Sequence, residues 1–137
     1  MTDGRVPRLI DTVAWVRIEK GRILCARPRG RHTFFIPGGK RERGETDRQT
    51  LVREIEEELS VTLLPETVEH VGTYEALATP TSAELVRMSC YTGDYQGLLT
   101  ASSEIEAVAW FRYADRAHVP PVDQLLFDDL ARAGLLQ

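Results

Sequence analysis

The sequence predicts an α+β fold in which helices pack on both faces of a mixed central β-sheet, an α/β/α sandwich formed by a single domain over residues 1–137. Two observations lead to this class. Strand-like segments precede a helical pattern, and further strands precede a second helical pattern, an order typical of helices that cover a sheet. The chain of 137 residues is 42% hydrophobic and 28% charged, which is the balance of a globular protein with its own core.

The first strands are predicted to form a hairpin. Residues 9–18 are rich in Val, Ile and Trp, and a short turn at residues 19–21 leads into a second strand at residues 22–26. Residues 27–32 form a basic loop. We expect a brief apolar strand at residues 33–36, which the following proline and glycines end.

The first helix is predicted to begin at Thr46, where the Thr-x-x-Gln pattern matches a capping box. Leu51, Val52, Ile55 and Leu59 then recur at helical spacing and lie within an arc of about 100°. These four side chains are the predicted buried stripe of the helix.

The second half of the chain repeats the order of strands followed by a helix. Strands are predicted at residues 68–78, 85–91 and 108–111, and an amphipathic helix at residues 122–133. The inward positions expected for that helix are Val122, Leu125, Leu126 and Leu130.

Composition excludes several classes of function. The net charge of −4 argues against long nucleic acid as a partner. No apolar run reaches the roughly 18 residues of a membrane span, and residues 1–5 lack the apolar core of a secretory signal. Cys25 and Cys90 lie inside apparent strands, without metal-ligand spacing, as expected of buried thiols in a reducing compartment. We therefore expect a cytoplasmic protein that contacts no membrane.

Three carboxylates gather on the first predicted helix. Glu54, Glu57 and Glu58 fall within an arc of about 100° at 3.6 residues per turn. Like charges at this spacing cost roughly 0.2–0.5 kcal/mol per pair, so the cluster indicates a bound cation. Hard ions such as Mg²⁺ prefer oxygen ligands and combine a few carboxylates with waters and substrate phosphates.

The segment from Gly39 to Val61 resembles the Nudix box, Gly-x5-Glu-x7-Arg-Glu-U-x-Glu-Glu-x-Gly-U, where U is a bulky aliphatic residue. Every fixed position matches except Ser60, which stands where the box has its last glycine. Residues 36–40 and 120–123 are also similar to the MutT-like branch of the family. The resemblance implies the Nudix fold for the predicted sandwich.

The resemblance also implies an activity. Nudix hydrolases split the diphosphate linkage of a nucleoside diphosphate joined to a group X, a reaction that depends on positioning and charge neutralisation. We expect a pyrophosphohydrolase that uses Mg²⁺, with Mn²⁺ as a substitute, and converts a (d)NTP or modified (d)NTP to the monophosphate and pyrophosphate. The alternatives are a hydrolase of ADP-ribose, nucleotide sugars or dinucleoside polyphosphates, a non-catalytic nucleotide sensor, and a plain scaffold. A monomer and a homodimer both remain open.

On this resemblance, Glu54, Glu57, Glu58 and the carbonyl of Gly38 hold the metal ion. Glu104 lies in a loop rich in Ser and Glu, where a carboxylate binds metal or accepts a proton from the attacking water. The alternative for Glu104 is a solvated loop residue.

Other residues of the box are assigned to support. Arg53 is a catalytic-site residue that orients neighbouring carboxylates, above all Glu45, because its guanidinium binds two oxygens at once; the alternative is a simple surface ion pair. Gly39 and Glu45 are structural, and Glu56 is solvated. Ser60 costs on the order of 1 kcal/mol if it adopts the left-handed conformation common at helix ends.

Four residues are candidate substrate contacts. Lys40 and Arg27 are placed to bind phosphate, although Arg27 is as easily a solubilising charge. Phe34 and Phe35 point to opposite faces of a strand, so Phe34 is assigned to the core and Phe35 is open to a base. Asp123 aligns with a position that reads a purine edge in the MutT-like branch, and its alternative is a helix N-cap.

Overall fold

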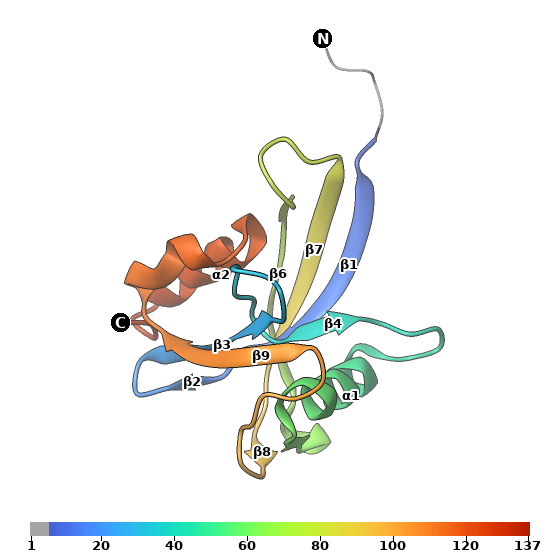
Figure 1. Cartoon of the computed structure of the whole chain (residues 1–137), viewed down its shortest axis with the longest axis vertical. Helices are drawn as coiled ribbons and strands as arrows, with labels where there is room; N and C mark the ends of the chain where they lie inside the picture. The colour runs from blue at the N-terminus through green and yellow to red at the C-terminus, as the bar shows by residue number, and fades with distance from the viewer. Residues whose placement is uncertain (1–5) are drawn as a thin grey trace.

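The computed structural model of the chain describes residues 6–137, so the expectation about a secretory signal rests on residues outside the described part. At its centre lies a four-stranded sheet in the order β4-β1-β7-β6. Strand β1 (Arg8–Trp15) pairs parallel with β7 (Glu84–Thr92) and antiparallel with β4 (Gly38–Lys40), while β6 (Glu69–Leu77) pairs antiparallel with β7 (Figure 1). The mixed sheet is confirmed.

Two smaller sheets complete the strand arrangement. Strands β2 (Ile18–Glu19), β3 (Arg22–Pro28) and β9 (Ile105–Phe111) form an antiparallel sheet in the order β2-β3-β9. Strands β5 (Thr62–Leu63) and β8 (Tyr95–Gln96) form a short antiparallel pair. The predicted hairpin is present only near its turn, where β2 pairs with β3. Most of the first arm expected at residues 9–18 is instead β1, which pairs with β7 and β4 in the central sheet.

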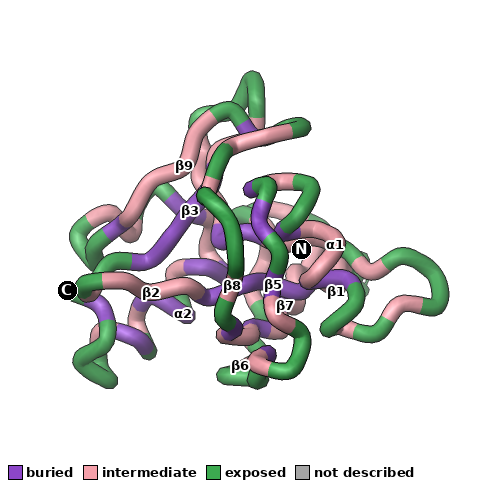
Figure 2. Tube along the Cα trace, turned by 90° about the horizontal axis from the view of Figure 1, so that it is seen from below, coloured by how far each residue is buried: buried purple, intermediate pink, exposed green. Residues whose placement is uncertain are grey.

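The helices α1 (Asp47–Leu59) and α2 (Pro121–Arg132) pack against opposite faces of the sheets. Alternation along β1 gives the reason, because successive strand residues point to opposite faces. Val13 and Trp15 join the apolar cluster of α1, whereas Ala14 joins the cluster of α2. The α/β/α sandwich is confirmed, and the buried stretches of β1 and β3 run through its middle (Figure 2). Short 3-10 helices at Pro65–Thr67 and Tyr113–His118 complete the fold.

The predicted limits of α1 hold in atomic detail. The Thr46 hydroxyl accepts a hydrogen bond from the Gln49 backbone N–H, and the Gln49 side chain accepts one from the Thr46 N–H. At the other end Ser60 adopts the left-handed conformation, with φ 59° and ψ 27°. Both ends of the helix are therefore fixed by local geometry that the sequence pattern indicated.

Two expectations about secondary structure were wrong. Residues 33–36 were expected to form a strand, but the structure shows there an isolated β-bridge between Phe35 and Ala26. The glycines expected to end that strand instead begin β4. In α2, Leu125 was expected inside but is 38% exposed, and Phe127 takes the buried place. A pattern of leucines alone did not show which of them faces the sheet.

Among the helices that the structure describes, none is long and apolar enough to cross a membrane. Both cysteine thiols, Cys25 and Cys90, are free and buried, as expected.

Candidate active site

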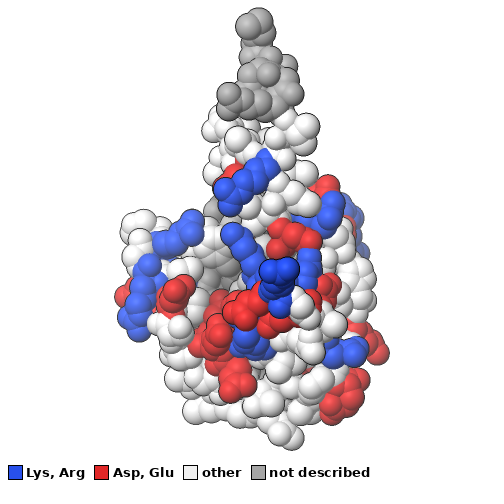
Figure 3. All heavy atoms as spheres, turned by 90° about the vertical axis from the view of Figure 1, so that its right-hand side faces the viewer, with Lys and Arg blue, Asp and Glu red and all other residues white. Residues whose placement is uncertain are grey.

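A cavity of about 790 Å³ lies between the central sheet, the segment before β4 and the start of α2. It joins two groups of candidate residues that are far apart in the sequence. The candidates that line it are Phe35, Gly38, Gly39, Lys40, Glu58 and Asp123. Acidic and basic side chains are interspersed on the side of the molecule that faces the viewer in Figure 3.

Of the acidic face of α1, Glu58 lines the cavity, whereas Glu54 and Glu57 are not among its lining residues. Glu58 is half-buried, and its Oε2 accepts a hydrogen bond from the Gly38 N–H at 3.0 Å. Burial, together with the charges of Glu54 and Glu57, raises the pKa of Glu58 from 4.5 to about 8. Burial also raises the pKa of Glu54, while the Glu57 side chain is 53% exposed.

The two glycines are required for this arrangement. A Cβ at Gly39 would lie 2.6 Å from the Glu54 carboxyl carbon, so a side chain there would displace the carboxylate. A Cβ at Gly38 would lie 2.0 Å from the Val13 carbonyl oxygen, and its φ of +152° also disfavours a side chain. The diglycine lets β4 pass close to both β1 and α1.

Arg53 and Glu45 form the predicted ion pair. Arg53 Nε and Nη2 donate to the two Glu45 oxygens at 2.7 and 2.9 Å, and Nη1 donates to Glu54 Oε1 at 2.9 Å. The Thr50 hydroxyl and the Glu42 N–H also donate to Glu45. The Arg53 hydrogen bonds, more than any other contact, lower the pKa of Glu45 to about 2. Arg53 therefore fixes the direction of Glu54 from outside the cavity lining.

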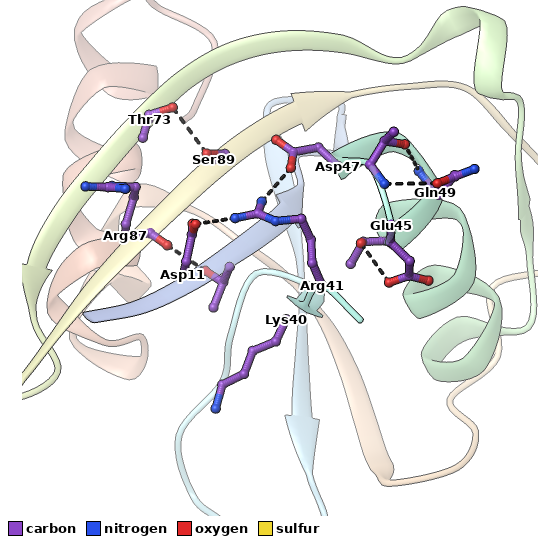
Figure 4. A network of polar contacts seen from close by, with 12 residues as sticks. Asp11, Lys40, Arg41, Glu45, Asp47, Gln49, Thr73, Arg87 and Ser89 are labelled. Carbon is purple, nitrogen blue, oxygen red and sulfur yellow. Dashed lines mark hydrogen bonds and ion pairs between the residues drawn. The ribbon is translucent and has the colours of Figure 1, made fainter. Parts of the chain in front are cut away.

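A second charged group fixes the start of the box, and the sequence did not indicate it. The Arg41 guanidinium bridges Asp11 of β1 and Asp47 of α1, and the Tyr91 hydroxyl donates to Asp47. In Figure 4 the Lys40 side chain extends away from Arg41. Arg41 directly follows β4 and is held by Asp11 and Asp47, whereas Lys40, the last residue of β4, lines the cavity.

Glu104 is exposed and lies outside the cavity lining, but it stands close enough to Glu58 for its charge to raise the Glu58 pKa. Its loop is fastened on two sides. The Ser102 N–H donates to the Glu58 carbonyl at 2.9 Å, and the Arg29 N–H donates to the Glu104 carbonyl at 2.8 Å. The structure thus brings Glu104 close to Glu58.

Asp123 and Phe35 also line the cavity. Asp123 is 3% exposed, and its Oδ2 accepts a hydrogen bond from the Ile36 N–H at 2.9 Å. Burial raises its pKa to about 7. The N-cap alternative was wrong, because the N-cap of α2 is Pro120. Asp123 can therefore both donate and accept hydrogen bonds near neutral pH.

Arg27 is not brought to the cavity. Its Nη1 lies 3.1 Å from Glu106 Oε2 and donates to the Arg31 carbonyl at 3.1 Å. Arg31 lines the cavity instead, with its guanidinium carbon 5.1 Å from the centre of the Phe35 ring. Further lining residues that the sequence did not single out are Thr33, Thr79, Ser82, Glu84 and Met88. The pairing of β1 with β7 brings the last four here, and no local signal shows that pairing.

The donor set fits a hard divalent cation by its chemistry. The negative charges of its carboxylates raise the pKa of their neighbours: Glu54, Glu57 and Glu104 raise that of Glu58, and Glu57 raises that of Glu54. The Arg53 guanidinium is hydrogen-bonded to Glu54. Within residues 6–137, however, no three acidic, His or Cys side chains already converge as metal ligands. One oxygen of Glu54 is held by Arg53, and one of Glu58 by Gly38.

Comparison with known proteins identifies the family. The chain matches the NUDIX domain model over residues 7–128. It is similar to the E. coli ORF135 protein, with TM-score 0.72 and 29% identity over 93% of this chain and 94% of that chain. It is also similar to the MutT protein of Methanosarcina mazei Go1, with TM-score 0.73 and 21% identity over 93% and 96% of the two chains. A NUDIX hydrolase from Nitrosomonas europaea gives TM-score 0.72 and 21% identity over 95% and 91%.

No curated protein is similar enough to count as a match. Because the family model covers most of the chain, the protein belongs to the Nudix family. It is a pyrophosphohydrolase with MutT-like structural neighbours, as the box predicted. Nudix hydrolases generally use divalent metal ions and act on small nucleotide substrates.

Proposed function

We propose that the protein is a Mg²⁺-dependent hydrolase that converts a (d)NTP or modified (d)NTP to the monophosphate and pyrophosphate. One observation supports this most strongly. A single cavity is lined by Glu58, Lys40, Phe35 and Asp123, so it offers carboxylate and ammonium groups for a phosphate chain and an aromatic ring for a base. The proposal includes a single domain over residues 1–137, a cytoplasmic location, and a monomeric or homodimeric state.

Each candidate metal ligand has a role in this reaction. Glu54, Glu57, Glu58, Glu104 and the Gly38 carbonyl are the candidate ligands. A divalent cation held by them would polarise phosphoryl oxygens and lower the pKa of a bound water. Mg²⁺ suits the all-oxygen set, and Mn²⁺ would substitute for it.

The remaining groups bind and orient. The Lys40 ammonium lines the cavity next to the diglycine and would neutralise a substrate phosphate. Arg53 keeps Glu54 in place through its hydrogen bond. Glu104 would accept the proton of the attacking water, because it is exposed and lies close enough to Glu58 to affect its pKa. Arg27 would contact a substrate phosphate only after its ion pair with Glu106 breaks.

Activity on a nucleotide panel tests the proposal. The protein is incubated with Mg²⁺ or Mn²⁺ and canonical, oxidised and methylated dNTPs, CTP, ADP-ribose, nucleotide sugars and dinucleoside polyphosphates, and the products are separated. Monophosphate and pyrophosphate from a (d)NTP are expected. Turnover of ADP-ribose, a nucleotide sugar or a dinucleoside polyphosphate alone would replace the substrate class. Nucleotide binding without turnover would indicate a sensor.

Substitutions on α1 test the assignment of the carboxylates. Glu57→Gln and Glu58→Gln are each expected to lower kcat by a factor on the order of 100 or more, because each removes a charge that would hold the cation. Glu56→Gln is the matched control, since Glu56 is an exposed carboxylate of the same helix. Near-normal activity of both test variants, with the fold intact, would remove the metal assignment.

Asp123 tests the proposed contact with the base. Asp123→Ala is expected to change the ranking of substrates. Asp123→Asn keeps an acceptor for the Ile36 N–H and removes the titration. Since burial raises the Asp123 pKa from 3.8 to about 7, the carboxyl lowers stability as pH rises through that window, and Asp123→Asn should be more stable than wild type above it. A lowered Tm with an unchanged ranking would limit Asp123 to a structural role.

A further inference from the structure

We propose that Ser60 and Ser102 are positioning residues: their linked hydroxyls fasten the C-terminus of α1 to the loop that carries Glu104, and so fix Glu104 relative to Glu58. This inference rests on the proposed function for its effect on catalysis. It concerns the position at which the chain departs from the Nudix box.

The C-terminal carbonyls of α1 are satisfied mainly by that loop. A helix leaves its last four carbonyls without partners inside the helix, so they need donors from elsewhere. The four hydrogen bonds run from the Ser60 N–H to Glu56 O at 3.0 Å, from the Ser102 hydroxyl to Glu57 O at 2.6 Å, from the Ser102 N–H to Glu58 O at 2.9 Å, and from the Thr100 N–H to Leu59 O at 2.9 Å. Ser102 alone therefore holds the carbonyls of two candidate ligands, Glu57 and Glu58.

Ser60 adds a contact that glycine cannot make. Its hydroxyl donates to the Ser102 Oγ at 3.0 Å, and Ser102 in turn donates to the Glu57 carbonyl. A serine in the left-handed conformation is less favourable than glycine at a helix end. The hydroxyl contact offsets this disadvantage by orienting the Ser102 hydroxyl toward the helix.

The same serine sets the position of Glu104. The Ser102 carbonyl accepts a hydrogen bond from the Ile105 N–H at 3.0 Å, which closes a tight turn around Glu104. On the far side of the turn, the Arg29 N–H holds the Glu104 carbonyl. A change of the Ser102 side chain is therefore expected to move Glu104 relative to α1 while leaving the acidic side chains themselves unaltered.

Steady-state kinetics test the coupling. Ser102→Ala is expected to lower kcat about tenfold with KM unchanged, and Ser60→Gly about threefold, both well inside the roughly hundredfold effect of a 1 Å misplacement. Ser102→Thr, which keeps the hydroxyl, should retain activity. Ser103→Ala is the control in the same loop. Because the two serines act through one contact, Ser60→Gly should cost nothing further in the Ser102→Ala background.

The Glu104→Gln variant serves to separate an effect on the position of Glu104 from a general loss of stability. In Glu104→Gln protein, Ser102→Ala should have no additional effect on kcat, because the residue it positions is already disabled. Equal losses in both backgrounds, or a Glu104→Gln variant as active as wild type, would overturn the proposal.

Hydrogen exchange tests the contact independently of catalysis. Ser60→Gly should speed exchange of the Ser102 and Thr100 amides, whereas Ser103→Ala should not. If wild type hydrolyses no nucleotide but this exchange pattern is found, the proposed function fails and the coupling stands. Unchanged exchange in Ser60→Gly protein overturns the coupling whether or not the protein is active.

Discussion

The two ends of helix α1 are held by different kinds of interaction. At the N-terminal end, charged groups close to the helix in sequence form ion pairs, centred on Arg53 with Glu45 and on Arg41 with Asp47. At the C-terminal end, neutral hydroxyl and backbone groups come from a loop about forty residues later, with Ser102 at its centre. The acidic face lies between these two attachments, so its mutually repelling carboxylates stay in place.

The difference shows how the site can be rigid at one end and adjustable at the other. The ion pairs at the N-terminal end are partly shielded from solvent, and Arg53 binds both oxygens of Glu45. The hydrogen bonds from Ser60 to Ser102 and from Ser102 to the Glu57 carbonyl are exposed, so each contributes only about 1 kcal/mol. We therefore expect large, charge-dependent effects at the first end and small, charge-independent effects at the second.

The largest effect is expected from Arg53→Met. This change leaves Glu45 and Glu54 without their shared cation, so we expect Tm to fall by roughly 5 °C or more, the scale of a strongly destabilising substitution in a domain of this size. Arg48→Met is the matched control, since Arg48 is an exposed arginine of the same helix. Thermal unfolding followed by circular dichroism measures both. Equal Tm values for the two variants would contradict the importance of the ion pairs.

The next effect separates the two ends by pH. The pKa of Glu45 falls from 4.5 to about 2 in the folded protein, so its carboxylate stabilises the fold fully above pH 4.5 and loses that contribution as pH falls toward 2. The stability difference between wild type and Glu45→Gln should therefore shrink over this window. The difference between wild type and Ser102→Ala should stay constant. Denaturant titrations at several pH values measure both, and a constant Glu45 difference would refute the assignment.

The smallest effect concerns Ser60. Ser60→Ala keeps the left-handed backbone and loses the hydroxyl, so we expect a loss of about 1 kcal/mol. Ser60→Gly loses the same hydroxyl but removes the unfavourable conformation, so its stability should lie within about 0.5 kcal/mol of wild type. Urea unfolding of the pair decides the matter. A Ser60→Gly protein as unstable as Ser60→Ala would show that the backbone conformation carries no penalty.

The sequence predicted the part of the site that is local along the chain. The capping box at Thr46, the shared face of Glu54 and Glu58, and the pairing of Arg53 with Glu45 all follow from helical geometry over a few turns. The expected strand at residues 33–36 failed because the apolar run there packs beside the cavity and pairs only at Phe35. A short apolar run does not show by itself whether it will pair as a strand or with which segment.

Distant residues could be placed only by the folded chain. Arg31 reaches the cavity while Arg27 contacts Glu106, although both belong to the basic segment 27–32 that was predicted as one loop; Arg27 lies in β3 instead. Asp123 is buried and accepts a hydrogen bond from the Ile36 N–H because α2 packs over that segment. No sequence pattern around either residue indicates this contact. Burial and partner identity depend on contacts between elements, which propensity and spacing do not encode.

By itself the sequence determined the family, the α/β/α fold and the shared helix face of the carboxylates that we propose as metal ligands, because a helix repeats its geometry from one turn to the next. The tertiary structure decided which charges surround the cavity, that Lys40 lines it while Arg41 is held by Asp11, and how Ser102 joins Glu104 to α1. The physical reason is that these contacts join residues brought together only by strand pairing and packing, whose partners no local pattern specifies.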